Sequence, residues 1–112
     1  MATTLLMDSP PKTLQRLRSL EQLYEQGYQD EIIDRAVYKL FEHKIRQDEV
    51  QLAELAVDLD GYEKQFGISS QQFAAKYAIG EWGDDSEGFE WNVLYKMYMR
   101  LHYEITTLKA QQ

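Results

Sequence analysis

Apolar side chains recur at steps of three and four residues along most of the chain, which is the spacing of one buried helix face. The first such segment spans residues 10–26, between an N-cap candidate at Ser9 and a helix stop at Gly27, and its apolar positions are Leu14, Leu17, Leu20 and Tyr24. Pro10 and Pro11 suit a first helical turn, where the missing N–H costs no hydrogen bond. We therefore expect a flexible N-terminus over residues 1–9, one helical domain over 10–109 and a tail over 110–112.

The second segment predicts a long helix over residues 31–66, with Asp30 as its N-cap. Asp48 occupies one position of a heptad seam that is otherwise apolar: Phe41, Ile45, Leu52, Leu55, Leu59, Tyr62 and Phe66. A helix of this length is about 54 Å long, more than a small domain needs. It must project, pair with another chain, or bend near Asp48 or Gly61. We expect an oligomer interface at Phe41, Ile45, Leu52, Leu55 and Leu59, as in a coiled-coil homodimer.

Two more helices are predicted in the C-terminal half. Residues 70–79 form a short one, because Ser69 and Gln72 make a capping box and Gly80 ends the segment. Residues 86–109 form a long one with the apolar positions Trp91, Leu94, Tyr98, Leu101, Ile105 and Leu108. Its seam resembles that of the 31–66 helix. The prediction is an all-α fold, a helical bundle or coiled-coil hairpin in which the long central helix pairs antiparallel with the C-terminal helix. The short N-terminal helix precedes this pair and the 70–79 helix forms its corner.

The negative charge lies in one half of the chain. The net charge is −7; residues 1–46 carry seven basic and seven acidic residues, and residues 47–112 carry five basic and twelve acidic residues. A chain this acidic lacks the positive surface that nucleic-acid binding needs, so direct binding of nucleic acid is not expected. The acidic half suits either solubility or contact with a basic partner protein.

The most acidic stretch, "GEWGDDSEGFEW" at residues 80–91, holds five carboxylates and no basic residue. A calcium loop that began at Asp84 would place Gly88 at its fifth position and Phe89 at its sixth, where a ligand and a glycine are required. The calcium pattern therefore fails, and we expect no metal. The stretch fits the start of a helix better, because Asp84, Asp85 or Ser86 can cap it, and Glu87 and Glu90 lie in its first turn.

Two tryptophans flank these acids. Trp91 lies on the apolar seam of the last helix, whereas Trp82 lies between glycines and acids, where core packing and interface contact remain alternatives. We therefore name five candidate partner-binding residues: Trp82, Asp84, Asp85, Glu87 and Trp91.

Catalytic and cofactor motifs are missing from the sequence. Cysteine is absent, neither histidine follows a glutamate by three residues as in di-metal helical bundles, and no glycine-rich phosphate loop follows a strand. We expect no enzymatic activity and no cofactor. The longest apolar runs are far shorter than the roughly 20 residues that cross a membrane, and no signal peptide is evident, so a cytoplasmic location is expected.

Two stretches, "LEQLYEQGYQDEIIDRAVYKLFEHKI" and "YEKQFGISSQQFAAKYAIGEWGDDSEGFEWNVLYKMYMRL", resemble a group of small helical proteins common in cyanobacteria and archaea. That group is described as the antitoxin-like member of a two-gene toxin–antitoxin pair. The likeness covers about residues 20–103, and its most recognisable part is "FGISSQQF" followed by the acidic stretch. The resemblance implies an all-helical fold and a protein partner. It brings no catalytic motif.

Three functions remain as hypotheses. The first is an antitoxin-like protein that neutralises a toxin enzyme, such as a ribonuclease, through the acidic C-terminal half. The second is a homo-oligomeric coiled-coil adaptor or scaffold. The third, a metal-dependent enzyme, has the least support in the sequence, because no ligand pattern with the required spacing is present.

Overall fold

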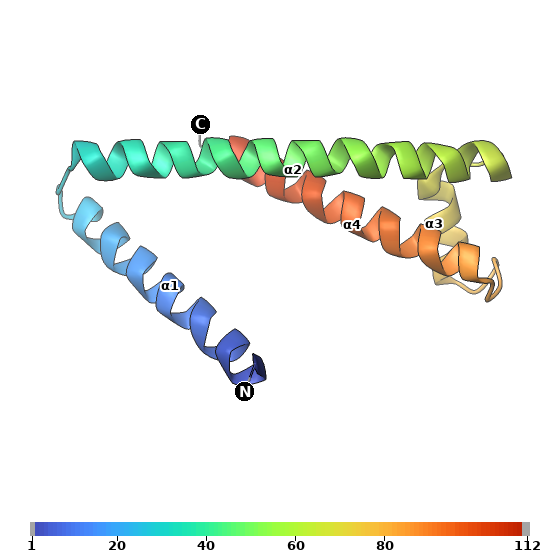
Figure 1. Cartoon of the computed structure of the whole chain (residues 1–112), viewed down its shortest axis with the longest axis horizontal. Coiled ribbons are helices and arrows are strands. Elements are labelled where there is room, and N and C mark those ends of the chain that lie inside the picture. Colours follow the sequence, from blue (N-terminus) through green and yellow to red (C-terminus); the bar gives the residue numbers. More distant parts are fainter. Residues whose placement is uncertain (1, 111–112) are drawn as a thin grey trace. The chain divides into compact units, whose positions relative to one another are not determined.

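The protein is described here by a computed structural model that covers residues 2–110, with side chains for residues 12–110. This part of the chain contains four helices, α1 (Ala2–Glu25), α2 (Glu31–Phe66), α3 (Ser70–Ala78) and α4 (Ser86–Lys109), and no strand (Figure 1). The predicted all-α fold is confirmed. The chain divides into two compact units, Met1–Val37 and Tyr38–Gln112, where the sequence predicted one domain over 10–109. Helix α2 contributes residues to both units.

The first unit consists of α1 and the first turns of α2. Helix α1 begins at Ala2, so the predicted start at residue 10 is wrong, and residues 2–9 are helical. The prediction took the two prolines as a helix start. An interior proline loses its own N–H hydrogen bond and crowds the carbonyl four residues before it, which disfavours a helix there but does not exclude one. The end of α1 was predicted closely: Gly27 has a φ of 97°, and the Tyr28 N–H donates to Leu23 O across it at 3.0 Å.

Asp30 starts α2 as predicted. Its Oδ1 accepts from the backbone N–H groups of Ile33 at 3.2 Å and Ile32 at 2.8 Å. The bond from Ile33, followed by the hydrogen bond from the Tyr28 hydroxyl, holds the pKa of Asp30 below its ordinary value. The Tyr24 hydroxyl donates to the Asp34 carboxylate at 2.7 Å, so a side chain of α1 is bonded to the first turn of α2. From Glu31 to Phe66 the helix is continuous, and it does not break at Asp48 or Gly61.

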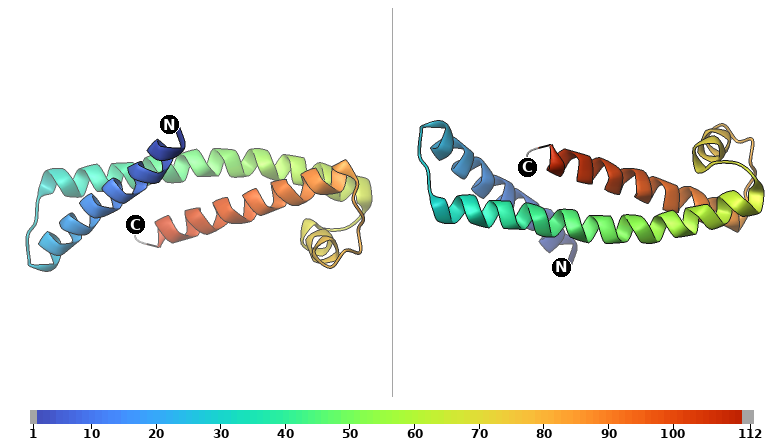
Figure 2. Two further views of the ribbon diagram at one scale, coloured as in Figure 1. Left: turned by 90° about the horizontal axis from the view of Figure 1, so that it is seen from below. Right: turned by 90° about the horizontal axis from the view of Figure 1, so that it is seen from above.

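The second unit is a helical hairpin. Residues 38–66 of α2 run antiparallel to α4, with α3 between them at one end (Figures 1 and 2), so the predicted antiparallel pair is confirmed. Its apolar seam consists of side chains that are less than a tenth exposed: Ile45, Leu55 and Leu59 of α2 and Leu101 and Ile105 of α4. The two helices share the seam periodicity that the sequence showed.

Both helices at the turn of the hairpin have side-chain caps. Ser69 Oγ accepts from the Gln72 N–H at 3.1 Å, and Gln72 Oε1 accepts from the Ser69 N–H at 3.3 Å, which is the predicted capping box. Asp85 is the N-cap of α4. Within residues 2–110, no helix is both long and apolar enough to cross a membrane.

Candidate functional site

An aromatic cluster fills the wide end of the hairpin. Trp91 of α4 has no exposed surface, and its ring stacks on Phe73 of α3 with a centroid distance of 3.9 Å. Tyr62 and Phe66 of α2 stack on the same indole at 5.4 and 5.5 Å. Three helices therefore meet on one tryptophan. A side chain with no exposed surface cannot contact a partner, so the prediction of Trp91 as a partner-binding residue is wrong.

Trp82 closes the same cluster from the loop before α4. Its ring makes edge contacts with Phe73, Phe66 and Trp91 at 4.9, 5.3 and 5.7 Å. The side chain is half-buried, and its indole Nε1 is buried without a hydrogen-bond partner. Of the two alternatives left open for Trp82, the structure favours core packing. What sequence reasoning could not see is that the indole lies against Gly88, where only a residue without a Cβ leaves room for it.

The three carboxylates predicted to bind a partner, Asp84, Asp85 and Glu87, make different contacts within the chain. Asp85 Oδ1 accepts from the Gly88 N–H at 2.7 Å and so caps α4, as the sequence predicted for this stretch. Glu87 accepts from the side-chain amide of Gln65 on α2 at 3.2 Å. Asp84 is exposed in the turn. Among the predicted partner-binding residues, Asp84, Asp85 and Glu87 therefore remain accessible.

Glu90 adds a carboxylate that the sequence analysis did not single out as a contact. It accepts a hydrogen bond from the Tyr62 hydroxyl. That bond, followed by desolvation and the negative charges of Glu90, Glu87 and Asp58, raises the pKa of Tyr62 to about 12. Two helices thus bring three carboxylates around one phenol.

A short chain of polar contacts holds α3 against the hairpin, and sequence reasoning missed it. Ser70, which is 3% exposed, donates its backbone N–H to Glu63 of α2 at 2.7 Å and accepts from Trp91 Nε1 at 2.9 Å. The buried indole N–H is therefore satisfied. In the sequence the capping-box spacing with Gln72 singled out Ser69, and no local signal marked Ser70 as a buried contact.

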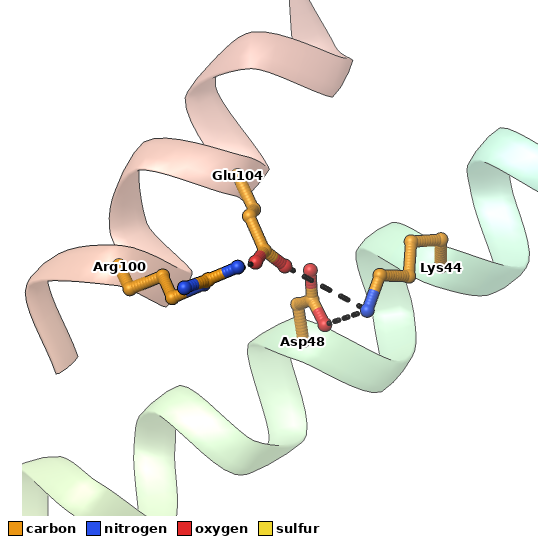
Figure 3. A network of polar contacts seen from close by, with 4 residues as sticks. All are labelled: Lys44, Asp48, Arg100 and Glu104. Atoms are coloured by element: carbon orange, nitrogen blue, oxygen red, sulfur yellow. Dashed lines mark hydrogen bonds and ion pairs between the residues drawn. The ribbon is translucent and has the colours of Figure 1, made fainter. Parts of the chain in front are cut away.

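A second polar network crosses the seam between α2 and α4. Asp48 is 1% exposed; its Oδ1 lies 3.0 Å from Lys44 Nζ and its Oδ2 is buried without a partner. Lys44 also lies 3.7 Å from Glu104 of α4, which pairs with Arg100 at 3.3 Å (Figure 3). The hydrogen bond to Asp48 is the largest cause that raises the pKa of Lys44. Asp48 at the seam thus forms an ion pair with Lys44 of the same helix.

The predicted oligomer interface of α2 is mostly used inside the chain. Ile45, Leu55 and Leu59 are buried in the second unit, and Phe41 and Leu52 are partly buried. Their burial in one chain leaves little apolar area for a second copy, so the prediction of an interface at Ile45, Leu55 and Leu59 is wrong. The seam pattern was identified correctly, but its partner is α4.

Open apolar surface lies in the first unit instead. A groove of about 340 Å³ lies between α1 and α2, with the lining residues Leu17, Leu20, Glu21, Tyr24, Ile33, Asp34 and Val37. No side chain among residues 12–37 is buried. Leu14 and Leu17 are 47 and 55% exposed, although they belong to the apolar stripe that predicted the helix, and Leu23 is 44% exposed. We call this surface the α1–α2 groove.

Within residues 12–110, no group of three or more histidine, cysteine or acidic side chains is placed to hold a metal ion. No protein-family model matches the chain, and comparisons with curated proteins and with solved structures give no match.

Proposed function

We propose that this chain is a non-catalytic partner-binding protein, and that the partner covers the α1–α2 groove. The observation that carries the proposal is the open leucine stripe of the first unit, in which no side chain among residues 12–37 is buried. A helical pair of this size cannot gain enough buried apolar area to be stable without another surface. Contiguous exposed apolar residues of this kind mark binding surfaces.

The charge of the chain supports a basic partner. The second unit, residues 38–112, carries eight basic and thirteen acidic residues and so holds −5 of the net charge of −7, which would attract a positive surface. An antitoxin-like role, in which the chain covers the basic substrate-binding surface of a toxin enzyme such as a ribonuclease, fits this charge. It also fits the resemblance of residues 20–103 to antitoxin-like helical proteins. A cytoplasmic location would accompany this role.

A homo-oligomeric adaptor is the second candidate, because a second copy of the chain could also cover the α1–α2 groove. In such an adaptor the contact between copies would not use Ile45, Leu55 and Leu59, because these side chains are buried in the chain itself. The light-scattering mass of the purified chain separates the two candidates. The antitoxin-like role alone predicts a monomer without its partner, and the adaptor predicts an oligomer that Leu17→Ser dissociates.

The test of the first candidate is binding to the product of the neighbouring gene. Leu17→Ser and Val37→Ser place a hydroxyl in the groove and should each weaken the dissociation constant about tenfold, as the loss of one central apolar contact does. Val57→Ser is the matched control, because Val57 is 71% exposed and belongs to the second unit. Unchanged affinity in both groove variants, with the partner still bound, would exclude the α1–α2 groove as the contact.

A further inference from the structure

A second exposed apolar surface lies on α4, in the row of residues that continues at Leu101 and Ile105 into its buried seam. Phe89, Val93 and Met97 follow one another at steps of four residues, so they form one stripe along the helix. Their exposed fractions are 63, 38 and 40%. From Phe89 to Met97 the stripe rises by eight residue steps, about 12 Å at about 1.5 Å per step, which corresponds to about two turns of a facing helix.

One carboxylate, Glu90, lies beside this stripe, and two more lie near the Tyr62 hydroxyl that Glu90 accepts from. Glu90 lies three residues before Val93 and seven before Met97, on the same side of α4. Glu87 and Asp58 are close enough to the Tyr62 phenol to raise its pKa together with Glu90. Among residues 12–110, Asp58, Glu87 and Glu90 form no ion pair, whereas Asp48, Glu49, Asp60 and Glu104 each do. The negative charge beside the stripe is thus not neutralised within the chain.

We infer that the stripe Phe89, Val93 and Met97, with the carboxylates Asp58, Glu87 and Glu90, docks a cationic amphipathic helix of a partner protein. Apolar side chains of that helix would lie on the stripe, and lysine or arginine side chains at its edge would pair with the carboxylates. This inference rests on the proposed function and deepens it, because it adds a second contact and its chemistry.

The charge decides between this occupant and two others. A second copy of the chain, related by a two-fold axis, would bring the same patch against itself and would oppose carboxylates to carboxylates. A nucleic acid would bring phosphates to a surface that is already negative. The helix dipole favours acidic side chains at the start of α4, which explains in part why Glu87 and Glu90 stand there. It does not explain Asp58, which lies in the interior of α2.

The experiment uses the full chain and a designed peptide of about 18 residues, five helical turns, with leucines on one face and lysines beside them. A second peptide of the same length carries glutamate in place of each lysine. In NMR titrations the lysine peptide should shift amide signals around residues 87–97, and the glutamate peptide should not bind. Equal binding of both peptides, or shifts centred elsewhere, would overturn the inference.

Variants make the test specific. Phe89→Ser should weaken binding of the lysine peptide about tenfold, and Asp58→Asn with Glu87→Gln should weaken it about threefold, with the larger loss at low salt. Glu25→Gln with Glu31→Gln removes the same charge from the first unit and should leave binding unchanged. Equal weakening by this control pair would show non-specific attraction and overturn the inference.

The two proposals fail in different ways. If the neighbouring gene product binds, needs Leu17 and Val37, and tolerates Phe89→Ser without loss, this inference alone is wrong. If it does not bind while the lysine peptide binds at residues 87–97, the inference holds and the proposed antitoxin-like role is wrong.

Discussion

The indole of Trp82 occupies the space that a Cβ on Gly88 would need. An ideal Cβ at Gly88 would lie 2.7 Å from Trp82 Cδ1, 2.9 Å from Trp82 Nε1 and 2.5 Å from Asp85 Oδ1. The glycine in the first turn of α4 therefore serves to let the loop tryptophan close the aromatic cluster. This close contact between Trp82 and Gly88 also explains why the Trp82 side chain is half-buried.

Gly88→Ala should therefore destabilise the protein by about 1–3 kcal/mol, because overpacking outweighs the gain in helix propensity. The free energy of unfolding in urea measures the change. Gly61→Ala is the matched control, since Gly61 lies in the interior of α2 and its Cβ would meet nothing within 4 Å. That variant should stabilise by about 0.5–1 kcal/mol. Stabilisation by both variants would contradict the packing described for Trp82.

The Ser70 hydroxyl should contribute measurably to the stability of the protein. Ser70→Ala leaves the buried Trp91 indole N–H without an acceptor, which should cost about 1–3 kcal/mol. Urea unfolding followed by tryptophan fluorescence reports both the stability and the environment of the indole. Ser86→Ala, at an exposed serine in the first turn of α4, should change stability by less than about 0.5 kcal/mol. If both variants lost the same small amount of stability, the Ser70–Trp91 hydrogen bond would not stabilise the protein.

Tyr62 should titrate late and make the fold sensitive to alkali. Its pKa of about 12 lies above the ordinary value of 10.0, so the folded state favours the protonated phenol. The stabilising contribution is complete below pH 10 and is lost as the pH rises toward 12. Glu90→Ala removes the acceptor of the hydrogen bond that is the first cause of the shift, and should lower the pKa of Tyr62 toward 10.0.

Ultraviolet titration of tyrosinate checks this, with Tyr62→Phe to assign the phenol. Asp34→Asn is the parallel control, because it should move Tyr24, whose pKa is also raised to about 12 by its hydrogen bond to Asp34, and leave Tyr62 unchanged. A Tyr62 signal that titrates near 10.0 in the unaltered protein would contradict the contact with Glu90.

The buried Asp48 should make Lys44 important for stability. Lys44→Met leaves a buried carboxylate without its cation and should cost about 1–3 kcal/mol, less than for a fully buried pair because Lys44 is half-exposed. Adding Asp48→Leu should restore or raise stability, since an apolar pair replaces the stranded charge. Lys109→Met breaks the exposed pair with Glu49 and should cost less than about 1 kcal/mol. A double variant less stable than Lys44→Met alone would contradict the account of the network.

The hairpin could be predicted from the sequence because its causes are local. The boundaries of α2 and α4 follow from apolar periodicity and from caps at Asp30 and Asp85, and α3 from the Ser69–Gln72 box. The partner of each apolar face could not be predicted in the same way. The seam of α2 suits another chain as well as α4, and only the three-dimensional fold shows that Leu55 and Leu59 are buried within the chain.

In the candidate site, too, local features could be predicted from the sequence and packing partners could not. Exposed acids in a loop were visible in the sequence, whereas the burial of Trp91 and the half-burial of Trp82 depend on contacts with Phe66 and Phe73 from other helices. The open α1–α2 groove could not be predicted either. Its leucine spacing is that of a buried face, and periodicity does not tell whether a face is covered.

Hydrogen exchange in the first unit tests the central claim most directly. The account predicts that, in the free monomeric chain, amides of residues 12–25 exchange much faster than those of α4, because no side chain there is buried. Binding of the neighbouring gene product should slow exchange in residues 12–25 and around the groove residues Ile33 and Val37. Full protection of α1 in the free monomer, unchanged on addition of a partner that binds, would contradict the claim that the groove is a binding surface.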